Sequence, residues 1–121
     1  GVDDLAIAYF EDAIERRPGY IPSLINVGNI RYLQGDIFGA LDHYEEAQIH
    51  APDHPDVLLS IARANHEIEN YGTARRAYAK LQEVAPAVAN RFAYLDLRGE
   101  EADRAAQAGD VADVVIWSEE E

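Results

Sequence analysis

This chain of 121 residues contains no cysteine, no methionine, one tryptophan and a single lysine. The absence of cysteine excludes disulfide bonds, thiolate zinc sites and cysteine nucleophiles, although it leaves the redox compartment open. No run approaches the roughly 18 consecutive apolar residues that a membrane-spanning helix needs. The sequence also shows no basic-then-apolar leader. The compartment therefore stays open, with a slight preference for the cytoplasm.

Basic residues are scarce as well. Ten basic residues stand against 23 acidic ones, which gives a formal net charge of −13. This charge repels phosphate backbones and anionic lipid headgroups, so we predict no nucleic-acid partner, no membrane partner and a preference for basic proteins or peptides. The acidic, lysine-poor composition resembles that of proteins from salt-rich cytoplasm. Codon bias together with the three glutamates at 119–121 is the slightly favoured explanation.

The few prolines are regularly placed. Three of them lie 34 residues apart, at Pro18, Pro52 and Pro86. An alanine stands twelve residues before each of them, and an aromatic residue stands eight before. These positions are Ala6, Ala40 and Ala74, then Phe10, Tyr44 and Tyr78. A fixed period of this length is typical of solenoids, in which each unit buries its apolar face only against its neighbours.

The apolar residues between these markers recur with helical spacing. We predict helices over residues 3–16, 22–33, 37–49, 55–68 and 71–84, separated by Pro, Gly, Asp and Asn residues that end or begin helices. A further helix is predicted from Val88 to Ala108. No segment alternates apolar and polar residues for long enough to predict a strand, except residues 111–117. That segment fits a short helix, an extended peptide or a frayed tail.

Residues 21–54 resemble the tetratricopeptide repeat. The positions that carry the resemblance are the bulky and small residues of two paired helices and a closing proline: Leu24, Val27, Gly28, Ala40, Tyr44, Ala47 and Pro52. Gly28 and Ala40 lack bulk, so the two helices can approach closely. Pro52 lacks the amide donor that the next helical turn needs, so the second helix stops there.

Residues 55–88 fit the same pattern, although Leu81 replaces a small residue and Glu69 stands where glycine is usual. Residues 1–20 match only the second helix of a repeat, so we expect a segment of a longer protein. Residues 89–109 form a degenerate repeat or a capping helix, because Asp96 replaces a small residue, and 110–121 form an acidic tail. The resemblance covers about residues 3–98. It implies an all-α, right-handed superhelix of antiparallel helix hairpins, a tetratricopeptide solenoid.

Tetratricopeptide arrays bind peptides or protein segments in a concave groove lined by the first helix of each hairpin. The resemblance therefore implies a protein–protein interaction module with a scaffold or adaptor role. The groove residues it implies are Ile25, Asn26, Asn29, Tyr32, Leu33, Leu59, Arg63, His66 and Tyr94, with Ser60, Glu67, Asn90, Ala93 and Leu97 on the same faces. Asn29 would bond a peptide backbone, Tyr32 and Tyr94 would anchor side chains, and Arg63 would hold a carboxylate. Only Asn29 matches the carboxylate clamp of chaperone adaptors.

Other roles stay open. Leu5, Tyr9 and Phe10 lie uncovered on one side of the first predicted helix, so the chain could self-associate through its terminal repeats. We expect either a monomer or a weak homo-oligomer. Residues 111–117, with Trp117, would cap the last helix or fill the groove. The four histidines lack metal-ligand spacing, and no serine or threonine stands in a nucleophile motif. We therefore predict no enzymatic activity, no cofactor and no metal.

Overall fold

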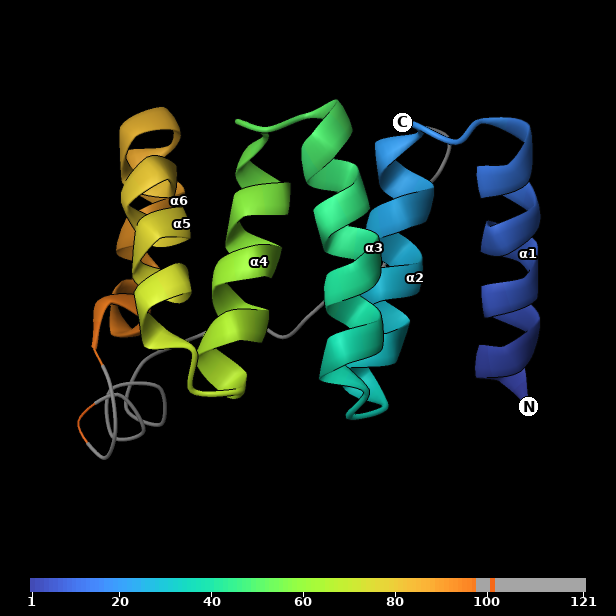
Figure 1. Cartoon of the computed structure of the whole chain (residues 1–121), viewed down its shortest axis with the longest axis horizontal. Coiled ribbons are helices and arrows are strands. Elements are labelled where there is room, and N and C mark those ends of the chain that lie inside the picture. The colour runs from blue at the N-terminus through green and yellow to red at the C-terminus, as the bar shows by residue number, and fades with distance from the viewer. Residues whose placement is uncertain (98–100, 102–121) are drawn as a thin grey trace. The chain divides into compact units, whose positions relative to one another are not determined.

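The computed structural model describes residues 1–97 and 101, and every regular element in this part of the chain is helical (Figure 1). The elements are α1 (Val2–Arg16), α2 (Ile21–Leu33), α3 (Ile37–His50), α4 (Pro55–Glu67), α5 (Tyr71–Val84), α6 (Pro86–Asn90) and the 3₁₀ helix η1 (Ala93–Asp96). The predicted all-α class is confirmed for these residues. Two compact units divide after Pro52: the first contains α1 to α3, and the second contains α4 to η1. The superhelical stack stays a prediction.

The first five helices begin and end within one residue of their predicted bounds. Three of them end in the same way, at residues that directly precede a proline and lie 34 positions apart. The backbone angles φ and ψ are −140° and 80° at Arg17, −146° and 73° at Ala51, and −150° and 69° at Ala85. The proline ring excludes the helical conformation from the preceding residue, so each helix stops there.

The turns inside the two hairpins also repeat at 34 residues. Gly35 and Glu69 both have a positive φ, of 85° and 62°. In each turn this residue donates its amide to a carbonyl three residues back, at 3.0 Å. The next residue, Asp36 or Asn70, donates to a carbonyl five residues back, at 2.9 and 2.8 Å. Two different sequences thus form the same type of turn. In the second one, Glu69 adopts a conformation that normally favours glycine.

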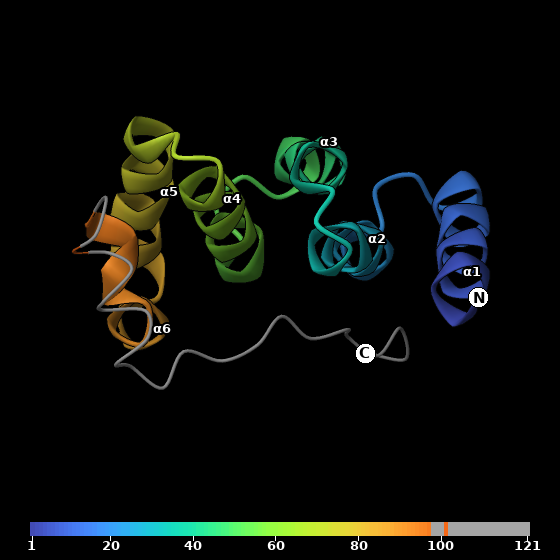
Figure 2. The ribbon, with the colours of Figure 1, turned by 90° about the horizontal axis from the view of Figure 1, so that it is seen from below.

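Helix α2 packs against α1 and α3 in the first unit (Figure 2). Gly28 lies where α2 meets the ring of Tyr44, and a Cβ atom at Gly28 would be 2.7 Å from Tyr44 Cδ1. Ala40 and Tyr44 are buried. The close contact predicted from Gly28 is therefore present. The core between α1 and α2 consists of Ile7, Phe10, Val27 and Ile30, with Ala6 and Ile14 packed against it.

Helix α5 is central to the second unit, because it packs against α4, α6 and η1. Its buried residues are Ala74, Ala77, Tyr78 and Leu81. Leu81, which replaces a small residue of the repeat pattern, is fully buried, so the second unit accommodates its extra bulk. The hydroxyl group of Tyr78 donates a hydrogen bond to the carbonyl oxygen of Ala89, at 2.8 Å, and so ties α5 to α6.

The helix predicted from about Val88 to Ala108 begins two residues earlier, and the prediction is wrong over residues 91–97, where the α-helix does not continue. Helix α6 begins at Pro86 and ends at Asn90, and a turn leads into η1. Its last turn is tightened, because Arg91 and Phe92 donate their amides to carbonyls three residues back. One of those carbonyls, on Ala89, also accepts the Tyr78 hydroxyl. The resulting bend buries Phe92 and Leu95.

The predictions for residues 110–121, including the tail role of Trp117, lie outside the described residues, as does most of 98–109. Glu101 is helical and exposed. Among the residues that the structure describes, no helix is both long enough and apolar enough to cross a bilayer.

Candidate functional site

The nine predicted groove residues differ in how much surface they present. Three residues of α2 are buried, at 1%, 0% and 5% exposed: Ile25, Asn26 and Asn29. His66 of α4 is also buried. Tyr32, Leu59, Arg63 and Tyr94 are half-buried, and Leu33 is 60% exposed. Five of the nine residues therefore retain surface that a partner can contact directly.

Asn29 takes part in the packing of its own hairpin. Its Oδ1 atom accepts a hydrogen bond of 2.6 Å from the hydroxyl group of Tyr44, and both residues are buried. The bond joins α2 to α3 beside the close contact at Gly28. A peptide that used the same Asn29 oxygen would have to compete with Tyr44. That Asn29 bonds a peptide backbone stays a prediction, and such a bond would first require the hydrogen bond from Tyr44 to be broken.

The structure brings three of the predicted residues together in the second unit. The ring of His66 lies edge-on to that of Tyr94, with 5.2 Å between centroids, and edge-on to that of Tyr71, at 5.0 Å. Its Nε2 atom is 2.9 Å from the carbonyl oxygen of Leu97. Because a carbonyl oxygen only accepts, Nε2 carries the proton. His66 thus fixes the chain that follows η1 against the end of α4.

Arg63 completes this cluster. Its guanidinium carbon lies 5.5 Å from the ring centroid of Phe92, which is a cation–π distance. Burial raises the pKa of the Tyr94 hydroxyl above its ordinary value of 10.0, while the charge and a hydrogen bond of Arg63 act in the opposite direction. Glu67 adds to the rise. Tyr94 is therefore a neutral phenol at neutral pH, held beside a guanidinium group that has an acidic neighbour.

Sequence reasoning missed two members of this cluster as site residues. Neither Tyr71 nor Phe92 is among the groove residues predicted from the sequence. Tyr71 reaches His66 across the turn at 68–70, so the turn conformation, which depends on the positive φ of Glu69, decides the contact. Phe92 meets Arg63 because α6 ends early. The sequence holds no signal for either event beyond the presence of an aromatic residue.

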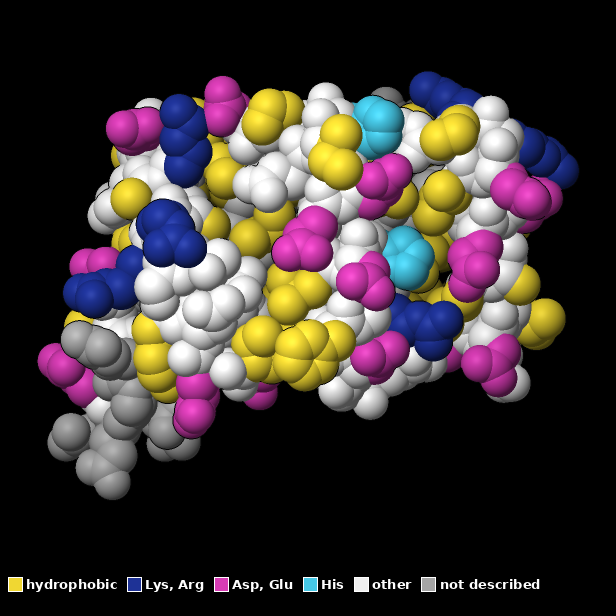
Figure 3. Space-filling model, viewed as in Figure 1, with side chains coloured by type: hydrophobic (Ala, Val, Ile, Leu, Met, Phe, Trp, Pro, Cys, Tyr) yellow, Lys and Arg dark blue, Asp and Glu magenta, His cyan; other side chains and the backbone are white. Residues whose placement is uncertain are grey.

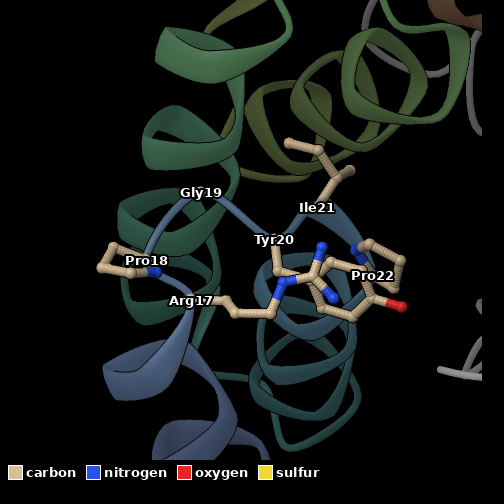
Figure 4. A pocket seen from close by; sticks show the side chains of 6 residues that line it. All are labelled: Arg17, Pro18, Gly19, Tyr20, Ile21 and Pro22. Atoms are coloured by element: carbon tan, nitrogen blue, oxygen red, sulfur yellow. The ribbon is translucent and has the colours of Figure 1, made fainter.

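A surface hollow of about 470 Å³ lies in the first unit, where the chain turns from α1 into α2 (Figure 4). Six consecutive residues line it, from Arg17 to Pro22. The guanidinium carbon of Arg17 is 4.0 Å from the ring centroid of Tyr20, and the two groups lie one over the other. The stacked pair fixes the loop. None of the nine predicted residues contributes to this hollow.

His54 and His50 also lie beside polar groups of nearby residues. The Nδ1 atom of His54 accepts a hydrogen bond of 3.2 Å from the amide of Asp56, and so caps the start of α4. His50 Nε2 lies 3.9 Å from a carboxylate oxygen of Glu46, one turn back on α3. Within residues 1–97 and 101, no three histidine, aspartate or glutamate side chains are grouped so that they could hold a metal ion.

No protein-family model matches this chain, and none of the curated proteins matches its sequence. The assignment of function therefore rests on the residues and their geometry.

Proposed function

We propose that this chain is a peptide- or protein-binding module built from tetratricopeptide-like hairpins, and that it recognises its partner through first-helix residues. One observation carries the proposal: the helix ends and turns repeat at the same 34-residue period as the sequence. A backbone that repeats in this way gives α2 and α4 the same place within their own hairpins, as the first helix of each. Repeats of this kind offer extended surfaces rather than a deep catalytic cavity.

The contact residues fall into one set in each unit. In the first unit they are Tyr32 and Leu33, which lie in the last turn of α2. In the second they are Leu59, Arg63 and Tyr94. Tyrosine and arginine, which both sets together supply, are among the residues enriched in binding hot spots. Ile25, Asn26, Asn29 and His66 are buried, so they act on binding by holding these residues in place.

The charge of the first unit favours a basic partner. Nine acidic residues and three basic ones lie in residues 1–52. A positively charged peptide is attracted to such a surface, and the attraction raises the association rate more than the affinity. In the second unit, Arg63 and the Tyr94 hydroxyl suit a carbonyl or carboxylate group of the partner. The first unit therefore suits a basic segment of a partner, and the second unit suits an acceptor group.

Selection of random peptides of about 12 residues on the whole protein, followed by calorimetric titration, tests this proposal. Tyr32→Ala is expected to weaken binding of a selected peptide by about tenfold or more, the usual loss when an aromatic anchor is truncated. Phe38→Ala is the matched control, because Phe38 lies on α3 of the same unit and is 70% exposed. Equal losses in both variants would contradict the proposal.

Tyr94→Phe serves the same purpose in the second unit. It removes only the hydroxyl group, so the ring contact with His66 is kept. Charge reversal at Arg63 is a poorer choice, because a carboxylate at this position would face Phe92, Tyr94 and Glu67 and would destabilise the fold. Unchanged affinity in Tyr94→Phe would remove Tyr94 from the contact set.

A further inference from the structure

Helix α4 begins with a cap that depends on the charge state of one side chain. The Nδ1 atom of His54 accepts a hydrogen bond of 3.2 Å from the amide of Asp56, one of the amides that a helix leaves unpaired in its first turn. A ring nitrogen accepts a hydrogen bond only while it carries no proton. The cap therefore requires a neutral imidazole with its proton on Nε2.

The same ring nitrogen lies close to a second group of Asp56. The carboxylate atom Oδ2 is 3.9 Å from Nδ1, so the ring of His54 lies beside a donor and an acceptor that belong to one residue. Burial raises the pKa of the Asp56 carboxyl above its ordinary value of 3.8, while the charge of His54 acts in the opposite direction. A protonated imidazole would repel the amide hydrogen and attract this carboxylate.

The side chain of His54 is 34% exposed, so protons from solvent reach it. Other charged groups near this turn lie beside one another. Lys80 of α5 lies 3.8 Å from Asp53 and 3.3 Å from Glu83, and acidic and basic side chains gather over the last turns of α5 and the start of α4, at the upper left of Figure 3. On α3, Glu46 lies 3.9 Å from a histidine of its own helix. We therefore expect the change of partner to take place within residues 54–56.

We infer that His54 is a pH-operated cap, which holds the first turn of α4 when it is neutral and releases that turn when it is protonated. Imidazole groups ordinarily gain a proton between about pH 5 and pH 8, so the change falls in mildly acidic solution. Release removes the side-chain acceptor of the Asp56 amide and places a positive charge at the positive end of the helix dipole. The ion pair with the Asp56 carboxylate offsets part of both effects, so the response is a local loosening.

The loosening is confined to the first turn, because buried residues hold the start of the helix in place. Val57 and Leu58 are 0% and 2% exposed. The hydroxyl group of Ser60 donates a hydrogen bond of 2.7 Å to the carbonyl oxygen of Asp56. The amide of Leu58 donates to the carbonyl oxygen of His54, at 3.0 Å. These bonds do not involve the imidazole, so they persist when it gains a proton.

The cap is a feature of the second unit. Helix α2 has the same place in the first hairpin, and its N-cap residue makes no side-chain capping bond. His54 and Asp56 belong to neither of the proposed peptide-contact sets. The inference therefore stands or fails separately from the proposed function.

Amide hydrogen exchange of the whole protein, followed by nuclear magnetic resonance, tests the cap. The measured quantity is the protection factor of the Asp56 amide, the ratio of the exchange rate in an unstructured peptide to the observed rate at the same pH. It is expected to fall at least about threefold from pH 8 to pH 5. His54→Asn is expected to hold it constant within about 1.5-fold, because asparagine is a good N-cap residue that does not titrate. His50→Asn on α3 is the control, and is expected to keep the full response of the wild type.

A constant protection factor in the wild type overturns the inference. A fall of the same size in His54→Asn also overturns it, because another group would then cause the change. Asp56→Asn keeps the amide and removes the carboxylate, so the fall is expected to remain and its midpoint to move to lower pH. A midpoint that stays in place overturns the pairing of the protonated ring with this carboxylate. Circular dichroism checks that each variant is folded.

Discussion

At the scale of single residues, the two hairpin turns show how one position decides the strain of a turn. Gly35 and Glu69 occupy equivalent places, and both have a positive φ. For a residue with a Cβ atom this conformation costs roughly 1–2 kcal/mol relative to the right-handed region. The second turn therefore contains strain that the first avoids, and the Tyr71–His66 contact depends on that turn.

Replacing the strained residue is expected to stabilise the second unit. Glu69→Gly removes the strain but increases the freedom of the unfolded chain, so we expect a net gain of about 0.5–1 kcal/mol in the free energy of unfolding. The reverse change, Gly35→Ala, is expected to cost about 1 kcal/mol. Urea unfolding of both variants measures these values. A destabilising Glu69→Gly would show that the glutamate makes contacts worth more than the strain.

At the scale of helices, the contact between α2 and α3 depends on the absence of a side chain at Gly28. A Cβ atom there would meet the buried ring of Tyr44, which also bonds Asn29. Gly28→Ala is therefore expected to destabilise the protein by about 1–3 kcal/mol, more than the helical preference of alanine offsets.

The matched control is Gly72→Ala on α5, where the nearest atom to an added Cβ would be Arg76 Nη1, at 3.7 Å. This site is open, so the control is expected to stabilise by up to about 1 kcal/mol. Thermal unfolding of the two variants separates the effects. Similar stability changes in both would contradict the account of the α2–α3 contact.

The helices that the sequence predicted correctly are those bounded by local signals. The prolines at 18, 52 and 86 and the turns at 35 and 69 act on their neighbours through backbone sterics alone, so their effect can be seen without a structure. The end of α6 cannot be predicted in this way, because it depends on a hydrogen bond from the hydroxyl group of Tyr78 to Ala89, eleven residues later. For the same reason the sequence indicated Arg63, His66 and Tyr94 but not the aromatic rings of Tyr71 and Phe92 that hold them.

At the scale of the whole molecule, the chain combines a strong negative charge with one buried and one half-buried tyrosine in the second unit, Tyr78 and Tyr94. Burial raises the pKa of Tyr78 above its ordinary 10.0, and the carboxylate of Asp96 raises it further. Burial also raises the pKa of Tyr94. Above pH 10 the unfolded chain therefore releases these protons before the folded chain does. The contribution of these two tyrosines to the free energy of unfolding is fully present below their unfolded pKa. It is lost as the pH rises through their folded pKa.

Stability measured by urea unfolding from pH 8 to pH 11 is therefore expected to decline along the alkaline limb. Tyr78→Phe is expected to flatten that decline. At neutral pH it is expected to cost about 1 kcal/mol, because the hydrogen bond to Ala89 is lost. An alkaline decline of the same slope in Tyr78→Phe would show that other groups cause it.

The central claim is that first-helix residues of the repeats bind a peptide. The most direct measurement is a nuclear magnetic resonance titration of the isotope-labelled protein with a peptide selected on it. The account predicts that the largest chemical-shift changes fall on Tyr32, Leu33, Leu59, Arg63 and Tyr94, whereas the exposed Phe38 and Ile49 of α3 stay unchanged. Largest changes on α3 or on the exposed Leu5 and Tyr9 of α1 would contradict it.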